Sequence, residues 1–163
     1  MLTGLLRRLF GSPAGSQADF ESAYRLYQEG ALEAADEHCA GLIREGRQLG
    51  DACYLRGLIA QQRAQPAQAA RYFRLALDHD DAQASFHLSL AQVLRGSGEP
   101  LSAASHFGRA AALLAEGDPA QVQALVEQCI ALEEGGDPAG AQERWRSVLA
   151  LDPDRPSTTQ RGH

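Results

Sequence analysis

The sequence predicts an all-α protein, a right-handed α-solenoid built from four helix-turn-helix repeats and preceded by a short N-terminal amphipathic helix. Three observations lead to this fold. Residues of matching type recur at intervals of 34 residues. Within each interval, apolar residues recur at three- and four-residue steps, which place them on one face of a helix. The second helix of three units also opens with proline, whose missing N–H costs nothing in the first turn of a helix.

The period of 34 residues is easiest to follow at one large position of the repeat. Phe73 is followed 34 residues later by Phe107, and one period earlier the same position holds Cys39. After a slip of four residues near 116–119, the position holds Trp145. Self-similarity at this period is typical of helical solenoids, in which each unit is one pair of helices.

Residues 1–11 precede the first unit and carry an amphipathic pattern. Their apolar side chains are Leu2, Leu5, Leu6, Leu9 and Phe10. Arg7 and Arg8 lie on the other side, Gly11 ends the predicted helix, and residues 12–16 form a linker of Pro, Gly, Ser and Ala. Three roles remain open for this helix. It covers the edge of unit one or lies in the groove, it docks on a partner or a second copy, or it weakly contacts a membrane surface.

The four units are expected at residues 17–49, 50–83, 84–121 and 122–154. Small residues such as Gly57 let two helices approach closely, whereas large ones such as Phe73 fill the gap between neighbouring pairs. One pair cannot bury its apolar face alone, so each unit depends on the next. The tail, residues 155–163, is predicted to be disordered, and we expect the last helix to carry a polar outer face or a partner that covers it.

The spacing of small residue, aromatic and Ala-Leu resembles the tetratricopeptide repeat. The closing run from Leu149 to Pro153 is part of the same resemblance, which covers residues 17–154. The large residue usual near the start of the first helix is replaced by Cys53 and His87 in units two and three. The closing proline is present only in unit four.

The resemblance implies a concave groove lined by the first helix of each unit, where peptides or partner helices bind. Carried over by register, the partner-binding residues are Phe20, Tyr24, Tyr27, Tyr54, Leu58, Gln61, Gln62, Leu88, Gln92 and Arg95. The same register adds Gln17, Gln28, Asp51, Ser85, Gln123, Val126, Ile130 and Glu133 to the lining. The N-terminal half is therefore expected to form an aromatic cradle, in which tyrosine supplies large contact area at small entropy cost. The alternative is that Phe20 and Tyr24 only pack under the N-terminal helix.

Composition and charge exclude several classes of function. The net charge of −6 argues against nucleic acid as a partner. All 15 basic residues are arginine, which we attribute to a GC-rich bacterial coding bias. Cys39, Cys53 and Cys129 fall on core positions, which fits a reducing, cytoplasmic setting. We expect no cofactor and no metal site, since the run Asp78–Asp81 lies in an inter-unit turn.

No group of residues suggests catalysis, and the chain is expected not to be an enzyme. His38, His87 and His106 occupy positions that the repeat assigns to packing. The predicted function is a non-catalytic adaptor or scaffold that binds a peptide or helix of a protein partner in the concave groove. Two alternatives remain: a repeat module of a larger glycosyltransferase, sulfotransferase or methyltransferase, and an assembly factor that self-associates as a homo-oligomer.

Overall fold

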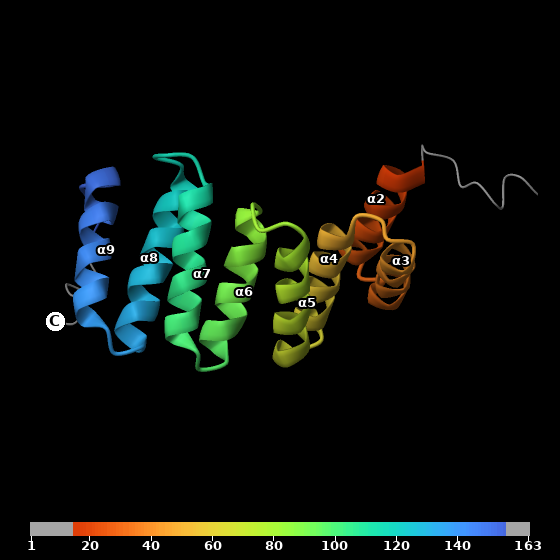
Figure 1. Ribbon diagram of the computed structural model, residues 1–163, viewed down its shortest axis with the longest axis horizontal. Helices are drawn as coiled ribbons and strands as arrows, with labels where there is room; N and C mark the ends of the chain where they lie inside the picture. Colours follow the sequence, from red (N-terminus) through yellow and green to blue (C-terminus); the bar gives the residue numbers. More distant parts are fainter. Residues whose placement is uncertain (1–14, 156–163) are drawn as a thin grey trace, which may run out of the picture.

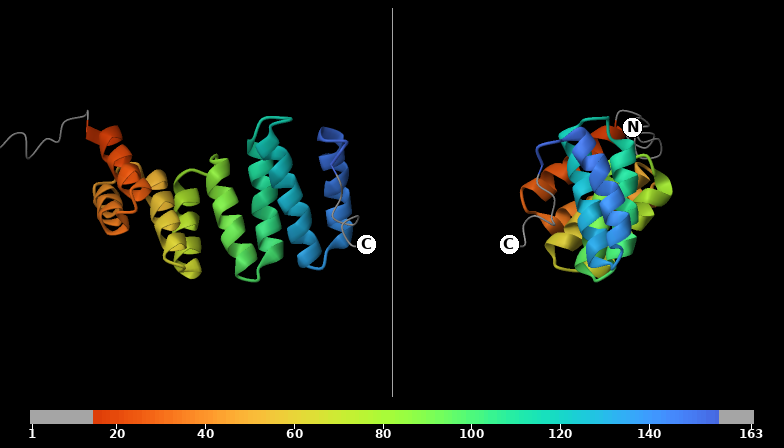
Figure 2. Two further views of the ribbon diagram at one scale, coloured as in Figure 1. Left: turned by 180° about the vertical axis from the view of Figure 1, so that it is seen from behind. Right: turned by 90° about the vertical axis from the view of Figure 1, so that its left-hand side faces the viewer.

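The computed structural model describes residues 15–155, all of whose regular structure is helical. The helices are α2 (Gly15–Gln28), α3 (Leu32–Arg44), α4 (Leu49–Gln62), α5 (Pro66–His79), α6 (Ala84–Gly96), α7 (Pro100–Leu113), α8 (Pro119–Glu134) and α9 (Pro138–Leu151). Figures 1 and 2 show them as a single extended row from α2 to α9, in which consecutive helices pack side by side. The predicted all-α solenoid is confirmed.

The helix bounds differ in detail from the predicted segments. Helix α2 begins at Gly15, inside the segment that was expected to be a linker. Helix α8 begins at Pro119, inside predicted unit three, because Asp118 caps it by accepting a hydrogen bond from the Ala120 amide at 2.7 Å. The predicted amphipathic helix, the rest of the linker and the tail after Arg155 lie outside the described residues.

One turn position shows how the repeat shapes the backbone between paired helices. Gly30, Gly98 and Gly136 all have φ between 79° and 82°, in the left-handed region. The matching position in unit two holds Ala64, which adopts the same region with φ 54°. Glycine reaches this region without steric cost, whereas alanine does not. Unit two therefore carries a strained turn between α4 and α5.

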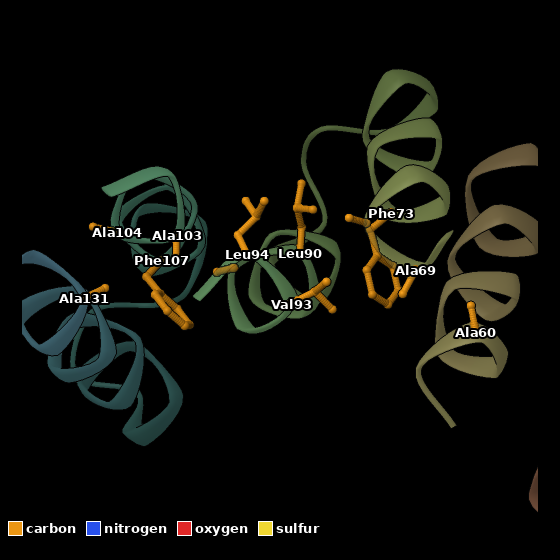
Figure 3. Packing of buried hydrophobic residues seen from close by; sticks show 12 residues of the cluster. Ala60, Ala69, Phe73, Leu90, Val93, Leu94, Ala103, Ala104, Phe107 and Ala131 are labelled. Atoms are coloured by element: carbon orange, nitrogen blue, oxygen red, sulfur yellow. The ribbon is translucent and has the colours of Figure 1, made fainter. Parts of the chain in front are cut away.

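The core is built around one aromatic residue per unit after the first. Phe73 and Phe107 are fully buried and Trp145 is 6% exposed, whereas unit one has the smaller Cys39 at this position. Figure 3 shows Phe73 and Phe107 in the continuous cluster that runs from α4 to α8. Gly57 lies directly under Phe73, since a Cβ atom at this position would be 2.3 Å from Phe73 Cε1. The small residue is thus required for close packing of α4 on α5.

The cysteines and histidines can be compared with their predicted packing positions. Cys39, Cys53 and Cys129 are buried, as predicted, and burial raises the pKa of the Cys39 thiol to about 12 and that of Cys129 to about 11. His87 is buried in α6. The expectation is wrong for His38, which is exposed on α3 because the neighbouring helices leave that side of unit one uncovered.

Candidate functional site

Three aromatic side chains run along one face of α2. Phe20, Tyr24 and Tyr27 are spaced by four and three residues, so they stack one above another on a helix. Their ring centroids are 6.4 Å apart for Phe20 and Tyr24, and 6.2 Å apart for Tyr24 and Tyr27. Tyr24 is 43% exposed, which leaves a large aromatic surface open to solvent.

Tyr54 joins α4 to the start of α6. Its ring stacks on Phe86 at a centroid distance of 4.6 Å and contacts Phe73 at 5.6 Å. Its hydroxyl lies 3.2 Å from Ser89 Oγ, within hydrogen-bond distance. Tyr54 is therefore a structural link between units two and three as well as a surface residue.

A cavity of about 250 Å³ lies where α2, α4 and the start of α6 meet. We call it the aromatic cradle, and its lining residues are Phe20, Tyr24, Asp51, Tyr54, Leu55, Leu58, Gln83, Ser85 and Phe86. Four of the predicted partner-binding residues are among them: Phe20, Tyr24, Tyr54 and Leu58. The register of the repeat thus brings together side chains from three successive units at one concavity.

The other predicted partner-binding residues do not line this cavity. Tyr27 packs against the buried cluster that units one and two share, and burial is the main cause that raises its phenol pKa. Leu88 is half-buried and packs against the central core. Gln62 and Gln92 are exposed on α4 and α6, and Gln61 is half-buried there.

Arg95 is held by acidic residues of α8. Its guanidinium donates a hydrogen bond to Glu127 Oε2 and lies 3.8 Å from Glu134 Oε2. Glu127 also accepts a hydrogen bond from the Gln123 amide at 2.8 Å, and Gln123 accepts one from Arg155 at 3.1 Å. This polar network links α6 to α8, so the surface of the C-terminal half differs in chemistry from the aromatic cradle.

Three lining residues of the cradle were missed by sequence reasoning. Leu55 is buried in α4, and Gln83 lies in the turn before α6. Phe86 matches Ala52 and Ala124 in the neighbouring units, and both of those are buried alanines. The repeat therefore gives no sign of an aromatic residue at this position.

A second, more polar cavity of about 150 Å³ adjoins the cradle and shares Asp51 and Phe86 with it. Its other lining residues are Gln48, Leu49, Gly50 and Asp80. The side-chain oxygen of Gln48 is buried and accepts no hydrogen bond in the described part of the chain. Burial, together with the charge of Asp80, raises the pKa of Asp51. This end of the cradle therefore offers acceptors that suit a cationic donor.

Within residues 15–155, no three or more His, Cys, Asp or Glu side chains are grouped in a way that could hold a metal ion. Among the same helices, none is both long and apolar enough to cross a bilayer.

Solved structures with the same arrangement of helices identify the fold. MamA superposes with a TM-score of 0.71 at 16% identity, over 86% of this chain and 75% of that one. YrrB, described as a TPR protein with an unusual peptide-binding site, superposes with a TM-score of 0.66 at 18% identity, over 86% and 70%. This is the tetratricopeptide-repeat (TPR) fold.

A third TPR-fold neighbour is SycD, the type III secretion translocator chaperone of Yersinia enterocolitica. It superposes with a TM-score of 0.63 at 17% identity, over 87% of this chain and 93% of its own. No family model matches the sequence, and no curated protein matches it. The TPR assignment thus rests on the arrangement of helices, which tolerates wide changes in sequence.

Proposed function

We propose that this protein is a non-catalytic interaction module that binds an apolar segment of a protein partner in the aromatic cradle. One observation carries the proposal: the cavity of about 250 Å³ is lined by aromatic and aliphatic side chains from three successive units. A concavity of this kind suits the side chains of a short helix or extended peptide.

The neighbours support the same class of function. YrrB is described as having a peptide-binding site and SycD as a translocator chaperone, and both descriptions are consistent with an interaction role for this chain. In this chain, the polar network around Arg95 occupies the C-terminal half of the row of first helices. We therefore assign recognition to the N-terminal half.

The test is a selection of random 12-residue peptides on the wild-type protein, followed by affinity measurements on variants. Tyr24→Ala is the diagnostic variant, because Tyr24 is exposed and, among the described residues, its ring stacks on the neighbouring rings of α2. Tyr54 is unsuitable, because its link to Ser89 and Phe86 stabilises the fold. Leu149→Ala is the matched control, since Leu149 is 39% exposed on α9, far along the row.

Selected peptides are expected to be rich in aliphatic and aromatic residues at helical spacing. They should lose roughly tenfold or more in affinity for Tyr24→Ala, as truncation of an aromatic anchor commonly does. Their affinity for Leu149→Ala should stay unchanged. Peptides that bind Tyr24→Ala as well as the wild type would place recognition elsewhere and overturn the proposal.

A further inference from the structure

We propose that residues 2–10 of this chain bind back into the aromatic cradle of the same molecule, so that the groove carries its own displaceable occupant. This inference rests on the proposed function, because it names an occupant for the same site. Three independent features support it: the reach of the chain, the apolar match and the distribution of charge.

The cradle lies within reach of the N-terminal segment. Helix α2 begins at Gly15, and a rise of about 1.5 Å per residue places Phe20 roughly 8 Å and Tyr24 roughly 14 Å along its axis. Residues 11–14 span up to about 14 Å when extended. The segment can therefore turn back and lie beside the aromatic face of α2.

The apolar surfaces of the segment and the cradle are complementary. Residues 2–10 carry four leucines and a phenylalanine at the spacing of one helical face. The cradle presents rings from α2, α4 and α6, and Tyr24 remains 43% exposed. Covering both surfaces at once removes apolar area from water on each side.

Charge favours the same occupant. All 21 acidic residues lie at or after Asp19, and the only charged side chains before it are Arg7 and Arg8. In the described part of the chain, Asp51 at the edge of the cradle forms no ion pair with an arginine, and the oxygen of Gln48 beside it lacks a donor. A guanidinium offers five donors and no acceptor, and its long stem can extend along an apolar face. It is also attracted to aromatic faces.

Covalent tethering favours residues 2–10 over a free partner as the segment bound in the cradle. A short linker gives an effective concentration in the millimolar range, so even weak contacts keep the segment bound for much of the time. A partner must then displace it, and its apparent affinity falls by the fraction of molecules in which the cradle is free. The segment thus sets a threshold for partner binding.

The first experiment places a nitroxide label on Thr3→Cys in the full chain and records amide signals by NMR. The three native cysteines are buried and leave the new thiol as the reactive one. Signals of α2 around Tyr24 and of the first turn of α6 are expected to be broadened, and those of α9 are not. The control carries the same label together with Leu5→Asp and Leu9→Asp, and should lose the broadening at the cradle.

A mixed sample then separates one molecule from two. Spin-labelled protein without ¹⁵N is added to ¹⁵N protein without the label, and no broadening is expected. Broadening in the mixed sample would show a second copy in the cradle, and no broadening at the cradle in either sample would leave it empty. Both results overturn the inference.

Peptide affinity distinguishes this inference from the proposed function. If the segment occupies the cradle about nine-tenths of the time, Leu5→Asp/Leu9→Asp should bind the selected peptides roughly tenfold more tightly than the wild type. An unchanged affinity that still depends on Tyr24 would overturn self-occupation and leave the proposed function standing. Loss of Tyr24 dependence would overturn the proposed function.

Discussion

At the scale of single residues, the histidine pair between α6 and α7 illustrates how burial couples to pH. His87 Nδ1 and His106 Nδ1 are 3.0 Å apart, and His87 Nε2 lies 3.1 Å from the carbonyl oxygen of Asp81. A carbonyl only accepts, so His87 Nε2 carries the proton and His87 Nδ1 accepts from His106 Nδ1–H. His87 is thus neutral in the folded protein, and burial, which lowers the pKa of His106, favours the neutral form of that ring as well.

The free energy of unfolding is expected to fall as the pH drops below about 6.5, the pKa of histidine in the unfolded chain. Burial lowers the pKa of both His87 and His106, and the charges of Arg109 and Arg74 act in the same direction, while Asp81 partly opposes them for His87. The unfolded chain therefore binds protons first, and the contribution of the pair is lost as the pH falls through the lowered folded-state values. Urea unfolding at pH 7.5, 6.5 and 5.5 measures this loss.

The variant His106→Gln should flatten that pH dependence, because one of the two coupled rings is removed. His38→Gln is the matched control, since His38 occupies the same repeat position in unit one and is exposed. An equal flattening in both variants would contradict the assignment to the pair.

At the scale of elements, the turn between α4 and α5 shows a repeat position filled by the less suitable residue. Ala64 has φ 54°, where units one, three and four have glycine. Ala64→Gly is expected to raise the free energy of unfolding by about 1 kcal/mol, because glycine adopts the left-handed region without the steric cost that alanine meets. Ala67→Gly, at an exposed position of α5, should lower it by a similar amount. Thermal and urea unfolding of both variants make the comparison.

At the contact between α4 and α5, a glycine is required for packing, so we expect its replacement by alanine to destabilise the fold. Gly57→Ala places a methyl group against the Phe73 ring, so we expect a loss of about 1–3 kcal/mol despite the better helix propensity of alanine. Gly96→Ala, in the last turn of α6 with no atom within 4 Å of the new Cβ, should be neutral or stabilising. Equal effects of the two changes in denaturant titrations would rule out close packing as the cause.

The helical pairs could be predicted because a periodic sequence records which faces are buried. Phe73, Phe107 and Trp145 mark one position in three units, and the structure places all three in the core. The site was only partly predictable. Tyr24 and Tyr54 followed from the register, whereas Phe86 did not, because the neighbouring units place alanine there. The pairing of His87 with His106 was hidden for a related reason: these two residues occupy different repeat positions.

At the scale of the whole molecule, the core is uneven along the row of units. Unit one has Cys39 where unit four, at the other end, has Trp145. In a solenoid each unit is stabilised by its own core and by its neighbours only, so terminal units open according to their own packing. The N-terminal end, which contributes Phe20 and Tyr24 to the cradle, is therefore the weaker end.

Hydrogen exchange followed by mass spectrometry should show this difference directly. Amides of α2 and α3 are expected to exchange faster than those of α8 and α9, because both pairs lie at an end of the described row and unit one has Cys39 where unit four has the larger Trp145. Helices α6 and α7 should exchange most slowly. Faster exchange in α8 and α9 than in α2 and α3 would contradict this order.

The buried thiols have a consequence for measuring such motions. Cys39 lies in α3, Cys53 in α4 and Cys129 in α8, so three units each hold one sulfur atom shielded from reagents. A thiol reacts as its thiolate, and burial raises the pKa of all three, so modification requires the surrounding helices to separate first. The unaltered chain therefore carries a built-in probe of unfolding. The order in which an alkylating agent modifies the three cysteines reports the order in which the units open.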